Sequence, residues 1–177
     1  ILTCLASRLS NKQVVWVEDR MEHLTAASSA TGRLTKIKAS IDDQGTIHAL
    51  DYDQIDDVGA YPRAPEPASL YRMHGNLSGA YKVKNIRCRN RVILTNKTPS
   101  GLNRGFGGPQ HYFALERLVH QIAVELKLNV LDVIKINLLE KNQFPYKSPS
   151  GALIDSGNFQ KLVNKVTESS TYKKILK

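Results

Sequence analysis

The spacing of apolar residues predicts helices in the second half of the chain. Within residues 109–126 these side chains recur every three or four positions and so share one helix face, at Leu115, Leu118, Val119, Ile122 and Leu126. A second helix is expected over residues 130–139. A last helix is expected over residues 158–167, with Asp155 and Ser156 as candidate capping residues.

Alternation of apolar and polar residues predicts strands in the first half. Ile37, Ala39 and Ile41 alternate with polar residues, as in a half-buried strand. A turn at residues 42–45 and a returning strand at residues 46–52 would complete a hairpin. The other expected elements are the end of a helix at 1–9, a buried strand at 14–18, a short helix or turn at 19–24, a loop at 53–67, a short helix at 68–74, a strand at 85–95 and a loop at 144–157. Strand hairpins followed by helices indicate an α+β fold.

Length and composition are those of one globular domain, residues 1–177. Hydrophobic residues make up 41% of the 177, which is enough for a core. No run approaches the ~18 apolar residues that a membrane-spanning helix needs. The chain begins at Ile1 rather than Met. We therefore expect a fragment of a larger subunit or one product of a split gene, without membrane contact.

Cysteines and histidines give no support to a metal site built from side chains. Cys4 and Cys88 lie far apart, and the five histidines include no pair at metal-binding spacing. Two distant thiols favour a reducing compartment. We expect a cytoplasmic protein that binds no metal directly through its side chains.

The net charge of +9 is partly concentrated in one predicted strand. Arg87, Arg89 and Arg91 are spaced by two, so on a strand they share a face and form a basic ridge. We favour a solvated edge strand, because basic residues protect such edges. A partner subunit or an anionic cofactor is the second interpretation, and nucleic acid the third, since aromatic residues do not interleave with the ridge.

Residues 104–110 (Arg-Gly-Phe-Gly-Gly-Pro-Gln) form a glycine-dense loop at the start of the predicted long helix. Gly105, Gly107 and Gly108 permit backbone angles that a side chain would forbid. Pro109 suits the first helical turn. Because a helix start offers free N–H groups, the loop could hold an anion, or it could be a helix-entry turn without a ligand. Its spacing matches neither a dinucleotide fingerprint nor a P-loop.

The order and spacing of several motifs resemble one family. The chain resembles the molybdenum-cofactor-binding large subunit of the xanthine dehydrogenase, aldehyde oxidase and carbon monoxide dehydrogenase family, and overall it is most similar to the carbon monoxide dehydrogenase branch. The segments that carry the resemblance are residues 15–24, 57–61, 95–99 with 104–110, 143–146 and 155–159.

The resemblance implies hydroxylation of a carbon, or oxidation of carbon monoxide, with water as the oxygen source. It implies a molybdenum held through a pterin dithiolene, in the cytosine dinucleotide form, with iron–sulfur clusters and FAD on partner domains or subunits. Arg104, Gly105, Phe106 and Gly107 would lie beside this cofactor. Phe106 would also contact the substrate, and Arg72 falls where related enzymes orient it. The alternatives are core packing for Phe106 and a structural ion pair for Arg72.

Departures from the family pattern bear on substrate and completeness. Asn103 replaces an aromatic residue, and the loop lacks the cysteine of carbon monoxide oxidisers, so an aldehyde or a heterocycle is the expected substrate. The family's upstream glycine-rich segment and its catalytic glutamate are absent, and Glu116 and Glu125 are expected to be solvated. We therefore expect no catalytic residue here and a chain that is incomplete as a catalyst. A non-catalytic assembly module and, more weakly, a nucleic-acid-binding domain are the alternatives.

Overall fold

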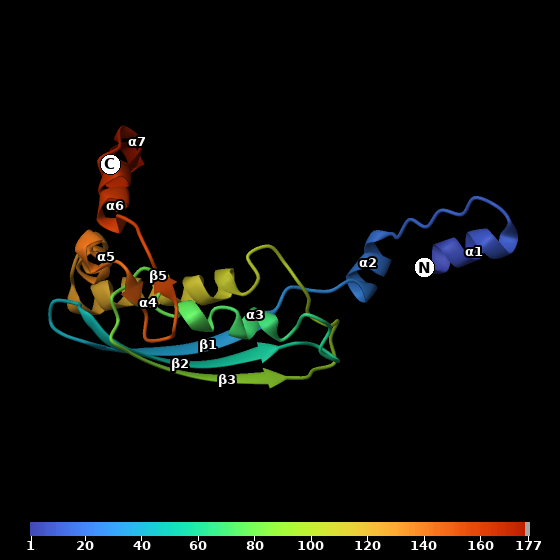
Figure 1. The fold of residues 1–177 in the computed structure, drawn as a ribbon, viewed down its shortest axis with the longest axis horizontal. Helices are drawn as coiled ribbons and strands as arrows, with labels where there is room; N and C mark the ends of the chain where they lie inside the picture. Colours follow the sequence, from blue (N-terminus) through green and yellow to red (C-terminus); the bar gives the residue numbers. More distant parts are fainter. Residues whose placement is uncertain (176–177) are drawn as a thin grey trace.

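The computed structural model describes residues 1–175 and has a three-stranded sheet with helices on one face (Figure 1). The strands are β1 (Gly32–Ile41), β2 (Ile47–Asp57) and β3 (Asn85–Ile93), in the order β1-β2-β3. β1 and β2 form the predicted hairpin, whereas β3 runs parallel to β2. The α+β prediction is confirmed.

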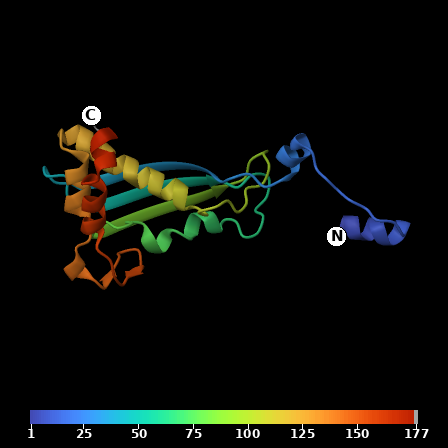
Figure 2. The same cartoon turned by 90° about the horizontal axis from the view of Figure 1, so that it is seen from above.

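Three helices lie over the inner face of the sheet: α3 (Ala68–Tyr71), α4 (Gly108–Leu126) and α5 (Val130–Asn137) (Figures 1 and 2). The predicted apolar face of α4 is confirmed, since Leu115 and Val119 are buried in one core with Leu50 and Tyr52 of β2. The remaining elements are α1 (Leu2–Ser10), α2 (Arg20–Ala26), η1 (His74–Asn76), η2 (Lys141–Gln143), β4 (Tyr146–Lys147), β5 (Leu153–Ile154), α6 (Phe159–Thr167) and α7 (Ser170–Ile175).

Asn137 joins the hairpin turn to α5. Its buried side-chain amide donates to the carbonyl oxygens of Gly45 and Val133, each at 2.8 Å, and accepts from the Ile47 N–H at 2.8 Å. A single side chain therefore satisfies backbone groups of the turn, of β2 and of α5, which fixes the end of the helical layer on the sheet.

Residues 1–26 form an N-terminal arm that extends away from the rest of the molecule (Figures 1 and 2). Neither α1 nor α2 contains a buried residue. The predicted buried strand at 14–18 is wrong, because this segment pairs with no strand of the described chain, and Trp16 is 69% exposed. The expected helix at 1–9 and the helix or turn at 19–24 correspond to α1 and α2.

Three further expectations require correction. Residues 53–57 are strand rather than loop, because pairing with both neighbours extends β2 to Asp57. The loop at 144–157 contains the small antiparallel pair β4 and β5. The N-terminus of α6 is capped by Asn158, whose side chain accepts from the Lys161 N–H at 2.9 Å, and not by Asp155 or Ser156. Among residues 1–175, no helix is long and apolar enough to span a bilayer.

Candidate functional site

The segment that leads into the glycine-dense loop is held by backbone bonds. The carbonyl of Gly59 accepts from the Thr95 N–H at 3.0 Å, and the Ala60 N–H donates to the Lys97 carbonyl at 3.0 Å. A Cβ on Gly59 would lie 2.5 Å from the Thr98 carbonyl oxygen, and its φ is +79°. Glycine is therefore required at position 59, where the backbone packs against the segment that leads into the loop.

The loop turns through three consecutive residues with positive φ. These are Gly105 (+89°), Phe106 (+38°) and Gly107 (+83°). A Cβ on Gly107 would lie 1.9 Å from the Ser69 carbonyl oxygen, so this glycine is packed against α3. The sequence suggested that this loop could hold an anion. At Gly107 the close neighbour is instead the protein's own helix.

The structure brings the two candidate substrate residues together. Arg72 follows α3 directly, and its guanidinium carbon lies 5.5 Å from the centre of the Phe106 ring. Arg72 is exposed and Phe106 is half-buried, which leaves the pair accessible to a small molecule. Among the described residues Arg72 forms no ion pair, contrary to the structural alternative for this residue.

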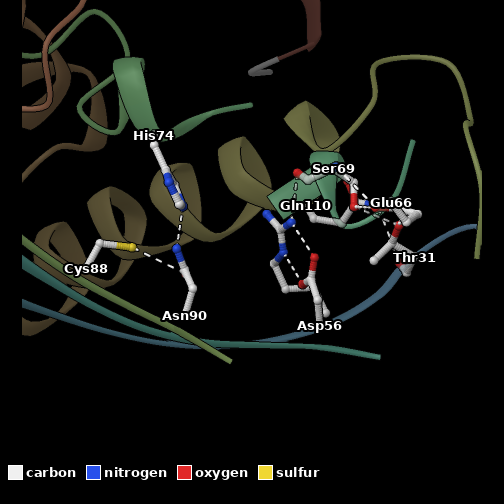
Figure 3. Close-up of polar contacts among 9 residues, drawn as sticks. Thr31, Asp56, Glu66, Ser69, His74, Cys88, Asn90 and Gln110 are labelled. Carbon is white, nitrogen blue, oxygen red and sulfur yellow. Dashed lines mark hydrogen bonds and ion pairs between the residues drawn. The ribbon is translucent and has the colours of Figure 1, made fainter. Parts of the chain in front are cut away.

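Beneath the loop lies a buried polar cluster (Figure 3). The Glu66 carboxylate accepts from the hydroxyls of Ser69 at 2.6 Å and Thr31 at 3.0 Å, and from the Ser69 N–H at 3.2 Å. Glu66 is thus a buried glutamate close to the loop whose carboxylate already accepts three hydrogen bonds. These bonds fix the start of α3, and they give Glu66 a structural role.

A second buried cluster lies between the sheet and α3. Arg33 of β1 and Asp56 of β2 face one another, with Nε–Oδ1 and Nη2–Oδ2 distances of 2.5 and 2.8 Å. Arg33 Nη2 also donates to the Ser69 carbonyl at 3.0 Å. Arg33, Asp56, Glu66 and Ser69 were not predicted from the sequence, although continuing the strand alternation would have placed the first two on the inner face.

Two histidines, His74 and His111, lie near Arg33 of this second cluster. His111 of α4 is fully buried, its Nε2–H donates to the Leu77 carbonyl at 3.2 Å, and burial lowers its pKa to about 4. His74 contacts Asn90, which in turn accepts from the Cys88 thiol at 3.4 Å (Figure 3). Burial lowers the pKa of His74 and raises that of Cys88. Both histidines are therefore held in an environment that favours the neutral ring.

A small cavity of about 80 Å³ opens beside the loop, lined in part by Arg104, Phe106 and Gly107. On its wall, Gln110 Nε2 donates to the Thr31 carbonyl at 3.3 Å, while the buried Oε1 has no partner among residues 1–175. Within the same described range the amides of Gly105 and Gly107 donate no hydrogen bond. The two free glycine amides suit an anionic group of a ligand held from outside, whereas the Gln110 Oε1 suits a hydrogen-bond donor. The described residues contain no group of three or more His, Cys, Asp or Glu side chains placed to hold a metal.

The predicted basic ridge is confirmed as an exposed edge strand, β3. Arg87 pairs with Asp51 at 2.5 Å, and Arg91 pairs with Asp53 at 2.6 Å. Arg89 approaches Asp53 at 4.0 Å. The aspartates of β2 therefore offset part of the ridge's charge, and Asp51's pKa is lowered chiefly by the Arg87 hydrogen bond.

Comparison with known proteins identifies the family of this chain. Residues 1–138 match the family described as the molybdopterin cofactor-binding domain. The chain belongs to that family. It is 28% identical to the 6-hydroxypseudooxynicotine dehydrogenase complex subunit gamma of Paenarthrobacter nicotinovorans, over 97% of this chain and 22% of that protein. It is 26% identical to the carbon monoxide dehydrogenase large chain of Hydrogenophaga pseudoflava, with the same coverage.

Solved structures of such enzymes share the fold of this family member. Quinoline 2-oxidoreductase from Pseudomonas putida 86 superimposes with a TM-score of 0.87 at 28% identity, over 98% of this chain and 22% of that one. Carbon monoxide dehydrogenase from Oligotropha carboxidovorans gives 0.84 at 26% identity, with the same coverage. The chain thus spans 22% of the length of these relatives. The predicted resemblance to molybdenum hydroxylase large subunits is confirmed.

Proposed function

We propose that this chain is part of the large subunit of a molybdenum hydroxylase that oxidises an aldehyde or a heterocycle with water as the oxygen source. The observation that supports this most directly is the placement of Arg72 over Phe106 at the glycine-dense loop. An aromatic ring can stack on a planar substrate, and a guanidinium can stabilise negative charge that develops on a substrate oxygen. The pair therefore offers both shape and charge recognition in a fold whose relatives include such oxidoreductases.

The cofactor of this proposal is a molybdenum–pterin group in its cytosine dinucleotide form. When bound, it would supply the oxidation chemistry. Arg104, Gly105, Phe106 and Gly107 would hold it, with the free amides of the two glycines and the Arg104 guanidinium facing its anionic groups. The metal would be held through the pterin rather than by side chains of this chain.

No glutamate of this chain is proposed as the general base. Glu66 is buried, but its carboxylate accepts bonds from Ser69 and Thr31 and so is committed to holding α3. Glu116 is exposed, as expected, and accepts from the Tyr81 hydroxyl at 2.8 Å. Glu125 is exposed too. The base would come from another segment of the large subunit, so the 177-residue chain alone would be catalytically incomplete.

The partners of this proposal are the remaining segments of the large subunit, together with iron–sulfur and FAD subunits. The N-terminal arm favours the presence of such a partner, because Leu5, Leu9 and Trp16 are exposed and neither helix of the arm contains a buried residue. A helix of nine residues is marginal in water without packing. The names of the relatives, which describe a complex subunit and a large chain, also fit an assembly of several chains.

A non-catalytic assembly module is the second candidate. The exposed apolar arm favours it, since the arm would serve assembly whether or not a cofactor is bound. Nucleic-acid binding has less support, because the arginines of the basic ridge are paired with Asp51 and Asp53.

The deciding experiment is co-expression of the chain with polypeptides that supply the rest of a large subunit, followed by molybdenum and pterin analysis of the purified complex. Stoichiometric molybdenum with pterin is expected. A complex that contains the Arg87→Met chain serves as the control. This substitution removes an arginine far from the loop, so the complex should retain both molybdenum and pterin. A folded, fully assembled complex without molybdenum or pterin would contradict the cofactor site and leave the assembly role.

A further inference from the structure

We propose that the buried Arg33–Asp56 pair positions α3 so that Ser69 and Arg72 meet Gly107 and Phe106 of the glycine-dense loop correctly. In this role neither residue touches a ligand. They act through Ser69, which lies between the sheet and the loop. The inference concerns contacts within this chain, so it stands whether or not the proposed enzymatic function is correct.

The geometry of the Arg33–Asp56 pair fixes the orientation of the guanidinium in addition to balancing its charge. Arg33 and Asp56 are directly opposite in the antiparallel register of β1 and β2, and their side chains are 1% and 0% exposed. The guanidinium makes two parallel bonds to the carboxylate, which leaves it little freedom to rotate. A guanidinium held in this way presents its remaining N–H groups in a fixed direction.

One of those N–H groups holds α3 in position through a backbone carbonyl. Arg33 Nη2 donates to the Ser69 carbonyl oxygen at 3.0 Å. This is the same oxygen against which Gly107 is packed, at the position where a Cβ would lie only 1.9 Å away. The sheet and the loop therefore contact one atom of α3 from two sides. A shift of this carbonyl would either open the contact with Gly107 or push the loop away.

The same helix carries Arg72. Its backbone N–H bonds to the Ala68 carbonyl at 3.0 Å, so Arg72 continues the turn that contains Ser69. A helix of four residues does not hold its own geometry, and its direction must come from outside contacts. Arg33 supplies one of these contacts, and Glu66 supplies another by accepting from the Ser69 hydroxyl and N–H. The distance of Arg72 from the Phe106 ring thus depends on the Arg33–Asp56 pair.

The test is fluorine NMR of the 177-residue chain labelled with 4-fluorophenylalanine, which has four reporter positions: Phe106, Phe113, Phe144 and Phe159. The Phe106 resonance is assigned with Phe106→Leu, and Arg72→Met gives its shift when the guanidinium is absent. Arg33→Met is expected to move the Phe106 resonance toward that value. The Phe144 and Phe159 resonances should stay in place, because those rings pack against each other away from α3.

Arg87→Met is the matched control, since Arg87 makes the same bidentate contact with Asp51 on the exposed side of the sheet. It should move none of the four resonances. If Arg33→Met unfolds the chain, Arg33→Lys is used, because a lysine keeps the charge opposite Asp56 but cannot bond the carboxylate twice and Ser69 as well. A folded Arg33 variant with an unmoved Phe106 resonance would overturn the proposal. Convergence of all four resonances to the shift of an unfolded chain in both variants would also overturn it, by assigning the pair to global stability alone.

Discussion

The guanidinium carbon of Arg72 lies 5.5 Å from the centre of the Phe106 ring, although the two residues come from different segments of the chain. Arg72 follows a four-residue helix, and Phe106 lies between two glycines of positive φ. A cation over an aromatic face contributes roughly 0.5–1 kcal/mol at an exposed site. The contact therefore orders both side chains weakly and leaves them free to receive a substrate.

Replacing Arg72 should affect catalysis far more than stability. In the assembled enzyme proposed above, Arg72→Met removes a charged hydrogen-bond donor, so kcat/KM should fall about 10- to 100-fold. The free energy of unfolding of the chain should change by roughly 0.5–1 kcal/mol. Steady-state kinetics and urea unfolding would measure the two effects. Arg117→Met, at an exposed arginine of α4, serves as the control. Equal kcat/KM for both variants would rule out a substrate role for Arg72.

Replacing Gly107 should destabilise the chain through two separable effects. In Gly107→Ala the new methyl group would clash with the Ser69 carbonyl and would also occupy a φ of +83°. Left-handed backbone costs about 1–2 kcal/mol and a forced contact about 1–3 kcal/mol more, so the loss should be about 2–5 kcal/mol. Chemical unfolding monitored by circular dichroism gives this value directly.

Alanine substitutions at two other glycines separate the cost of backbone strain from the cost of the steric clash. Gly151 has a φ of +104°, but apart from Gly151 and its two chain neighbours no atom of residues 1–175 lies within 4 Å of the position that a Cβ would take there. Gly151→Ala should therefore cost only about 1–2 kcal/mol. Gly75 has neither a strained φ nor a close neighbour in that range, so Gly75→Ala should change stability by no more than about 0.5 kcal/mol. Similar losses at Gly107 and Gly151 would mean that the Ser69 contact is not tight.

The sequence predicted those parts of the fold that depend on local periodicity. The apolar positions of α4 and the alternation around Ile37 are local patterns, and both elements are present as expected. The prediction of a buried strand at residues 14–18 was wrong for a physical reason. A run such as Val15 to Val17 indicates burial, but it does not identify the surface that would cover it, and in the described chain it is exposed.

The candidate site was predictable only in part. The glycine spacing alone indicated the loop, whereas Arg72 and the roles of the loop residues followed from resemblance. Nothing in the sequence placed the Arg72 guanidinium over the Phe106 ring. Arg33 could have been found by continuing the alternation of β1 backwards from Ile37. Asp56 could have been found by continuing the alternation of β2 forwards, because the inward face of β2 alternates regularly from Leu50 to Asp56. Glu66 could not have been found in this way, because it lies in a segment without periodicity and its partners are set by tertiary packing.

Removing the Asn137 amide should loosen the hairpin from the helical layer. Asn137→Ala leaves the Ile47 N–H and the carbonyls of Gly45 and Val133 without this partner, so the loss should be about 2–4 kcal/mol. Asn129→Ala is the control. It removes an exposed N-cap bond of α5 to the Leu131 N–H and should cost about 1 kcal/mol. Thermal and urea unfolding of both variants would measure the difference, and a smaller loss at Asn137 than at Asn129 would contradict the proposed link.

Acid should begin to weaken the fold at pH values above those at which the aspartates titrate. Burial lowers the pKa of His111 to about 4 in the folded chain, from an ordinary value of 6.5. The unfolded chain therefore binds this proton more readily. The stability due to the neutral ring is complete above pH 6.5 and is lost as the pH falls toward 4. At about pH 5 the loss relative to about pH 7.5 should be about 2 kcal/mol, and His74, whose pKa is also lowered, adds to it.

Urea unfolding at these two pH values tests this dependence. The aspartates with lowered pKa, such as Asp51 and Asp57, do not interfere, because their contribution is lost only as the pH falls below about 3.8. His111→Gln should be less stable near neutral pH, since a buried ring is lost, but its stability should fall less between the two pH values. His120→Gln, at an exposed position of α4, should keep the full fall. A fall of the same size in His111→Gln would show that another group carries the pH dependence.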